Sequence, residues 1–290
     1  MRLVFANALL PAALLLACTC ALAQDKVGAS AQDRAEAVLA PVTSTATRDP
    51  VEKSYRKIIK GMDLFEEHKR VLAPNASLRF KLLPRQPGTD MNGITVEIAG
   101  DTVALPVFVA RDRTFTMERN QKALDENALV MPNRKAASMT WRTEIRTPGL
   151  PPNTRRLGDL RLECLVGNEA GLVSNSRAVF GRIASMIVGA AGYCGRVDSQ
   201  YLYFSDRPLF GVTLVSGNRR EALSIDKLYA GASYDSNLKS DLPYCDCQVL
   251  IDRTYFLPLG DRSWPDDTLV EYEYMDDNDG RATEIAPSSG

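Results

Sequence analysis

This sequence of 290 residues contains a single histidine, His68. Histidine is the commonest general base and metal ligand near neutral pH. A Ser-His-Asp or Cys-His catalytic arrangement would have to use this residue, which lies in a run of charged residues and is expected at the surface. Zinc sites built on two histidines are excluded by the count.

Several motifs that identify enzyme classes are missing as well. The chain contains no G-x-x-x-x-G-K-[ST] phosphate loop, no G-x-S-x-G nucleophile motif and no C-x-x-C redox pair. Net charge is also nearly absent, at −1 from 35 basic and 36 acidic residues, which gives no general reason to expect a nucleic-acid partner. We therefore predict no catalytic residues, no cofactor and no metal site, and we favour a protein that is not an enzyme.

The N-terminal residues 1–23 have the three parts of a bacterial secretory signal. Arg2 supplies the positive start, an apolar run extends from Leu3 to Ala17, and Ala21-Leu22-Ala23 has the small-x-small form of a cleavage site. The run is short for a membrane helix, and no later stretch is long and apolar enough to span a bilayer. We therefore expect export to the periplasm or cell envelope, with a mature chain that begins at Gln24.

The same apolar run contains Leu15-Leu16-Ala17-Cys18, which resembles the lipobox of bacterial lipoproteins. In that interpretation Cys18 is acylated and anchors the protein in the outer membrane. Cleavage after Ala23 would leave four cysteines, an even number, whereas cleavage before Cys18 would leave an odd Cys20 beside the acylated residue. Soluble export is the first expectation, and the lipid anchor is the alternative.

The mature chain would contain four cysteines, which are Cys164, Cys194, Cys245 and Cys247. In an oxidising compartment such thiols form disulfides, and four of them allow three pairings. If Cys245 and Cys247 lie on a strand, they point to the same face but are too far apart for easy closure. Each of these two is therefore expected to bond to one of Cys164 and Cys194. A four-thiolate zinc site and a redox or free-thiol role are alternatives that the spacing disfavours.

Hydrophobic periodicity predicts two helices. Residues 50–71 and residues from about 174 to 190 have apolar side chains at three-and-four spacing. Residues 24–49 are small and polar and predict a flexible leader, and 280–290 predict a polar tail.

Alternation of apolar and polar residues predicts many short strands. They are expected at 77–83, 93–99, 102–109, 113–118, 137–147, 159–166, 200–204, 209–215, 221–225, 246–251, 254–257 and 268–274. Gly100-Asp101 and Ser216-Gly217-Asn218 are typical of hairpin turns. The fold class predicted is mainly β with two helices (α+β), as an antiparallel β-sandwich-like body stapled by disulfides. We expect one helix plus β-rich domain over 50–167 and a second over 168–279.

Charge is unevenly distributed along the chain. Residues 134–161 are mainly basic, and residues 266–279 are mainly acidic. Solvated strand faces and loops would explain both stretches. The alternative is that the two stretches attract each other, or that one of them binds a charged partner.

These features favour an exported cell-envelope protein, most simply a non-enzymatic binding or structural module whose partner is an envelope protein or a glycan. The alternative is a carbohydrate-binding or carbohydrate-hydrolysing periplasmic protein, which would need a cleft with aromatic side chains and, for hydrolysis, two facing carboxylates. A third hypothesis is a metal or redox protein built on the four cysteines. Candidates for stacking on sugars, all of which core packing would also explain, are Trp141, Trp264, Tyr201, Tyr203, Tyr255, Tyr272 and Tyr274.

Overall fold

The computed structural model describes five stretches of the chain, which are residues 52–84, 88–135, 138–172, 192–229 and 251–278. The predicted signal, leader and tail lie outside these stretches. So do the helix expected from about residue 174 and nearly all of the strand expected at 246–251.

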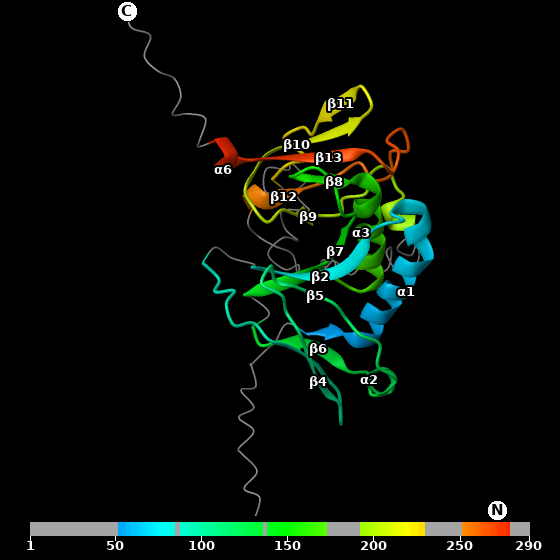
Figure 1. Ribbon diagram of the computed structural model, residues 1–290, viewed down its shortest axis with the longest axis vertical. Helices are drawn as coiled ribbons and strands as arrows, with labels where there is room; N and C mark the ends of the chain where they lie inside the picture. The colour runs from blue at the N-terminus through cyan, green and yellow to red at the C-terminus, as the bar shows by residue number, and fades with distance from the viewer. Residues whose placement is uncertain (1–51, 85–87, 136–137, 173–191, 230–250, 279–290) are drawn as a thin grey trace, which may run out of the picture. The chain divides into compact units, whose positions relative to one another are not determined.

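The described strands form four antiparallel sheets (Figure 1). The sheet of order β1-β6-β3-β4 consists of Lys53–Ser54, Leu129–Pro132, Val96–Ala99 and Ala104–Val107. The sheet of order β5-β2-β7 consists of Thr114–Phe115, Ser77–Pro84 and Met139–Arg146. The sheet of order β11-β10-β13-β8 consists of Arg219–Ala222, Leu209–Ser216, Leu269–Tyr274 and Thr154–Arg156. The two-stranded sheet β12-β9 consists of Thr254–Tyr255 and Tyr203–Phe204.

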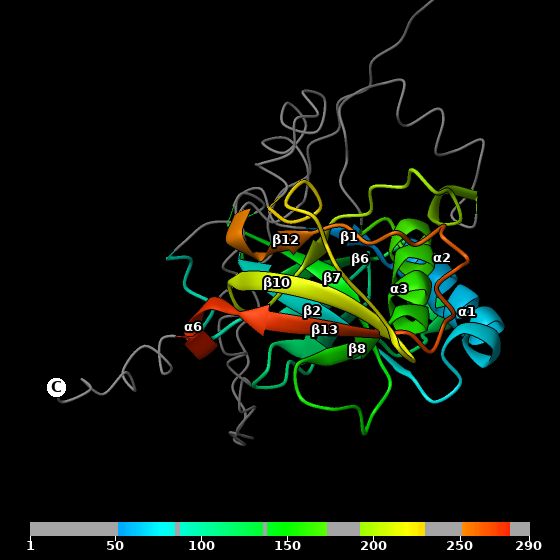
Figure 2. The ribbon, with the colours of Figure 1, turned by 90° about the horizontal axis from the view of Figure 1, so that it is seen from above.

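The helical elements are α1 (Tyr55–Leu72), α2 (Gln121–Asp125), α3 (Leu157–Glu169), η2 (Ile251–Arg253) and α6 (Met275–Asn278). The predicted fold class, mainly antiparallel β with two longer helices and a disulfide, is confirmed. The longer helices α1 and α3 lie next to each other on the same side of the sheets (Figure 1, Figure 2). No helix in the described part of the chain is both long and apolar enough to cross a membrane.

Helix α1 is the helix predicted over residues 50–71. The side chain of Ser54 caps its first turn by accepting a hydrogen bond from Lys57 N at 3.4 Å. Basic residues in the last turn complement the helix dipole. Gly61 allows a close approach to α3, because a Cβ at this position would lie 2.9 Å from the Cβ of Ala170.

Helix α3 corrects the sequence prediction, which expected a strand at 159–166. Its residues from Leu157 to Gly167 are all buried, so the helix has no polar face and no amphipathic period. Charged residues can alternate with apolar ones here because Asp159, Arg161 and Glu163 each have hydrogen-bond partners. Asp159, for example, accepts hydrogen bonds from Thr147 N and Oγ1, both at 2.8 Å. The resulting alternation imitates the pattern of a half-buried strand.

Both predicted hairpins are present. β3 and β4 pair around the turn at residues 100–103, where Gly100 N donates to Val103 O at 2.8 Å. β10 and β11 pair around Gly217, whose φ of 56° suits glycine. The strands expected at 113–118, 200–204 and 254–257 are also present but much shorter. Six short elements were not predicted from the sequence, namely β1, β6, β8, α2, η2 and α6.

Two hydrophobic cores support these sheets. One lies among α3 and the strands β9, β10, β12 and β13, and the other among α1, α2 and the strands β2, β3, β6 and β7. Helix α1 and strand β7 contribute to both cores, since Phe65 and Ile145 belong to the first and Ile58 and Trp141 to the second. The domain division expected at 167/168 stays a prediction.

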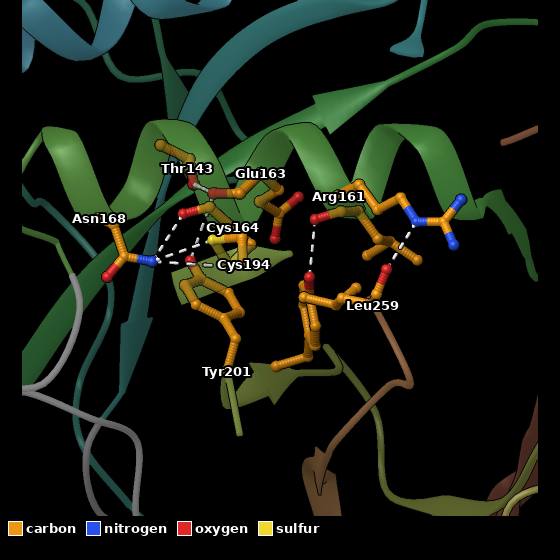
Figure 3. The surroundings of a disulfide bond; sticks show 10 residues. Thr143, Arg161, Glu163, Cys164, Asn168, Cys194, Tyr201 and Leu259 are labelled. Atoms are coloured by element: carbon orange, nitrogen blue, oxygen red, sulfur yellow. Dashed lines mark hydrogen bonds between the residues drawn. A yellow bond between two sulfur atoms is a disulfide. The ribbon is translucent and has the colours of Figure 1, made fainter. Parts of the chain in front are cut away.

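The structure bonds Cys164 of α3 to Cys194, with a Cα–Cα distance of 6.0 Å. The expectation that each of these two would bond to Cys245 or Cys247 is therefore wrong. Cys164 lies in a buried helix rather than on a strand, and its neighbourhood is completed by Asn168, whose Nδ2 donates to Cys164 O at 2.9 Å (Figure 3). Cys245 and Cys247 lie outside the described residues.

Candidate functional site

A cleft of about 270 Å³ is lined by residues of β2, β7, β8, α3, β9, β12 and β13 and of the segments next to them. Charged and tyrosine side chains dominate its lining. The charged ones are Lys81, Arg142, Glu144, Arg146, Arg155, Glu163, Asp206 and Arg207. The tyrosines are Tyr201, Tyr203, Tyr255, Tyr272 and Tyr274.

Strand β7 contributes three charged residues at alternate positions to the lining. Arg142, Glu144 and Arg146 therefore project from one face of the strand. Arg146 Nε donates to Glu144 Oε1 at 2.9 Å, and Lys81 Nζ on the neighbouring β2 lies 3.9 Å from the same oxygen. Arg142 is buried, and its guanidinium carbon lies 4.5 Å from the ring centre of Phe204. The Glu144 carboxylate therefore accepts a hydrogen bond from one guanidinium group and lies near one ammonium group, while Arg142 donates to Leu172 O at 2.9 Å.

Strand β8 and helix α3 contribute a buried ion pair to the lining. Arg155 Nη2 forms a close salt bridge with Glu163 Oε2, and each side chain is only 8% exposed. The backbone of Ile145 completes the arrangement, since its carbonyl accepts from Arg155 at 2.7 Å and its N–H donates to Glu163 at 3.2 Å. The pair thus joins β8 and α3 to β7.

The ionisation of this pair reflects two opposing effects. Burial raises the pKa of the Glu163 carboxyl, and the neighbouring Arg155 acts in the opposite direction. Burial also acts to lower the pKa of the Arg155 guanidinium, but the Glu163 carboxylate together with the nearby Tyr272 and Tyr255 holds that pKa well above the ordinary value. Since each group is engaged by the other, the pair forms a fixed part of the cleft lining.

The five cleft tyrosines form a continuous row of rings from β9 through β12 to β13. Successive ring centres lie 4.8, 5.4, 5.5 and 6.3 Å apart, which is the range of favourable aromatic contacts. The hydroxyl of Tyr203 donates to Leu160 O at 2.7 Å, and the hydroxyls of Tyr255 and Tyr272 lie 2.8 Å apart. Burial raises the pKa of Tyr201 to about 12 and that of Tyr272 to about 12.

We expect these two tyrosines to make the protein sensitive to alkali. Because their folded-state pKa values are raised, the stability that they contribute is complete below pH 10.0, the ordinary tyrosine pKa, and is lost as pH rises to about 12. Each shift corresponds to about 2–3 kcal/mol. Tyrosinate absorbance and circular dichroism should change together in this range, and Tyr201→Phe should move the transition to higher pH. Tyrosines that ionise at their ordinary pKa in a folded chain would contradict this prediction.

The segment after β9 adds two more charged residues to the cleft. Asp206 Oδ2 accepts from Lys81 Nζ at 2.6 Å, which connects this segment to β2. Arg207 Nε donates to Asp276 at 2.9 Å, and its guanidinium carbon lies 4.3 Å from the ring centre of Tyr274. The hydrogen bond from Arg207 holds the pKa of Asp276 below its usual value.

The structure places the candidates from the sequence as follows. Cys164 and Cys194 are buried and do not line the cleft, while Cys18, Cys245 and Cys247 lie outside the described residues. Trp141 and Trp264 are core residues that no ligand can reach. All five tyrosines line the cleft, but four of them are almost fully buried, so they shape the cleft more than they offer flat platforms.

The uneven charge distribution is the sequence feature that relates to this site, although it predicted no site residue. Arg142, Arg146 and Arg155 all belong to the basic stretch 134–161. The alternative, that this stretch attracts the acidic one, holds for one ion pair of the described residues, since Arg161 Nη1 donates to Asp266 Oδ1 at 2.6 Å. The carboxylates of the cleft, in contrast, carried no distinguishing pattern in the sequence.

Comparisons add no functional information to this geometry, since no protein-family model, no curated protein and no solved structure matches the chain. Within the described stretches, no group of three or more His, Cys, Asp or Glu residues could hold a metal ion. The chemistry of the cleft is therefore judged from its own side chains.

Proposed function

We propose that the protein is an exported, non-enzymatic cell-envelope protein that binds an acidic sugar of the envelope in this cleft. The observation that carries the proposal is the excess of cations in its lining, where five basic side chains accompany three carboxylates. Guanidinium groups suit carboxylate ligands because they donate two parallel hydrogen bonds. The Cys164–Cys194 disulfide supports export, since such bonds persist in oxidising compartments.

Exposure separates the side chains that can reach a ligand from those that shape the cleft. The side chains of Arg146 and Arg207 are 50% and 36% exposed, whereas that of Arg155 is 8% exposed and engaged by Glu163. Phe204 of β9 is half-buried in the cleft lining and offers an apolar surface of the kind that packs against sugar rings. We therefore assign carboxylate recognition to Arg146 and Arg207.

The state of the carboxylates favours binding over hydrolysis. A glycosidase needs one carboxyl that donates a proton and a second that acts as base or nucleophile. Glu163 is held by Arg155 and by Ile145 N–H, and Glu144 is held by Arg146 with Lys81 nearby. A carboxylate engaged by cations, as Glu144 is, makes a poor proton donor. Burial raises the pKa of Glu163, but this side chain is only 8% exposed and is engaged by Arg155.

The proposal is tested by calorimetric titration of the protein with D-glucuronate, with D-glucose as the neutral analogue. Glucuronate should bind, more weakly at higher salt, and glucose should not. Arg146→Ala should weaken glucuronate binding about tenfold, because it removes a charge-assisted hydrogen bond.

The matched control is Arg220→Ala. Arg220 also pairs with one carboxylate, Glu271 at 2.6 Å, and its side chain is 58% exposed, but it lies on β11 away from the cleft lining. This variant should bind glucuronate as the unchanged protein does. Equal binding of glucose, or an equal loss in both variants, would refute the proposed site.

A further inference from the structure

A second cavity of about 330 Å³ adjoins the cleft. The two share a row of lining residues from β2 and from the end of β9, namely Lys81, Leu83, Phe204, Ser205 and Asp206. Beyond this shared row, the second cavity is lined by Leu82, Pro84, Arg111, Asp112, Arg113 and Arg253. Since the two hollows have a common border, they form two compartments of one groove.

The border between the compartments is an ion pair. Lys81 Nζ and Asp206 Oδ2 lie 2.6 Å apart, and both residues line both cavities. The side chain of Asp206 is 46% exposed and that of Lys81 is 16% exposed. An anionic ligand lying across the border would meet Lys81 and would compete with Asp206 for it.

The second compartment is cationic like the first. Arg253 Nη1 donates to Asp206 O at 2.9 Å, which fixes its guanidinium at the border, and its buried Nε has no hydrogen-bond partner among the described residues. Arg111 and Arg113 are exposed, and neither forms an ion pair with another residue of the described stretches. A single carboxylate, that of Asp112, accompanies these three arginines in the lining outside the shared row.

Arg113 is held beside β2 by a strained turn. Its φ is 65°, a left-handed conformation that costs an arginine more than a glycine. Arg113 N donates to Ala110 O at 2.9 Å, and Arg113 O accepts from Leu82 N at 3.0 Å. An arginine at a position that glycine would occupy more easily points to a role for its side chain.

We propose that the two compartments together bind an acidic oligosaccharide, with one uronate carboxylate near Arg146 and another near Arg111 and Arg113. The inference rests on the proposed function and extends it from a single acidic sugar to a chain of them. The part of the chain between these two uronates passes over Lys81 and beside Phe204, which are common to both compartments.

The test is calorimetric titration of the full chain with galacturonic acid and with its linear tetramer. The tetramer should bind about tenfold more tightly than the monomer, because a second charged contact is made without a second loss of translational freedom. Arg113→Gly should remove about this tenfold gain for the tetramer and leave the monomer unaffected. Because glycine adopts this φ without strain, the melting temperature of the variant should be unchanged or higher, which separates lost binding from lost folding.

A second variant tests the border. Asp206→Asn removes the carboxylate that pairs with Lys81 and should therefore strengthen tetramer binding, whereas Arg220→Ala should leave tetramer binding unchanged.

If monomer and tetramer bind equally and Arg113→Gly has no effect, the two-compartment inference is overturned while the proposed function stands. If neither sugar binds, the proposed function itself fails. An acidic peptide of the same charge that binds as tightly as the tetramer would overturn the assignment to a sugar.

Discussion

Replacing Arg155 with methionine should lower the free energy of unfolding by about 3–5 kcal/mol, because it leaves the Glu163 carboxylate buried without its partner. Both side chains are only 8% exposed, so water cannot take over the role of the guanidinium. The measurement is urea-induced unfolding followed by circular dichroism. The deficit should shrink in acid, since burial raises the pKa of Glu163 and protonation removes the uncompensated charge.

The matched control for this prediction is the exposed pair Arg220–Glu271, whose side chains are 58% and 35% exposed. Arg220→Met should cost less than about 1 kcal/mol. The double variant Arg155→Met, Glu163→Leu should recover much of the stability, because apolar side chains of similar size can replace a buried ion pair. A single Arg155→Met variant as stable as its Arg220→Met control would contradict the buried pair described here.

Removal of the disulfide should have an effect of similar size. Cys164 and Cys194 are separated by 30 positions in the sequence, and a loop of this length is expected to contribute about 3–4 kcal/mol by restricting the unfolded chain. The double variant Cys164→Ala, Cys194→Ala should therefore unfold at lower urea concentration. Both cysteines are buried, so reductant should act on the native protein only slowly.

Thiol alkylation and intact mass provide the check on this bond. In protein prepared under oxidising conditions, Cys164 and Cys194 should be modified only after denaturation and reduction. The control is the reduced, unaltered protein, which should be about as unstable as the double variant. Alkylation of either cysteine in unreduced, denatured protein would show that the bond is absent.

The local pattern of apolar and polar residues was sufficient to predict the elements that have one buried face and one exposed face. Helix α1 buries one face and exposes the other, and the β3–β4 and β10–β11 hairpins combine alternation with glycine turns. Helix α3 could not be predicted because its surroundings are the same on all sides. Its polar residues Asp159, Arg161 and Glu163 are satisfied by partners elsewhere in the chain, and no local rule anticipates such partners.

The candidate site was predictable only in part for a related reason. The basic stretch 134–161 was visible in the sequence, but the cleft exists because Lys81 approaches Asp206, 125 positions further along the chain. The disulfide shows the same limit. The even number of cysteines in the expected mature chain favoured disulfides. That Cys164 bonds to Cys194 follows from its place on a buried helix, which the sequence did not predict.

The order of the β11-β10-β13-β8 sheet bears on how the chain folds during its synthesis. β13 is the last described strand, yet it lies between two strands made earlier, and Val270 faces both Leu214 of β10 and Arg155 of β8. This sheet cannot close until translation has passed residue 274, and pairings this distant in sequence form slowly. Folding of this sheet is therefore completed only after nearly all of the described chain has been synthesised.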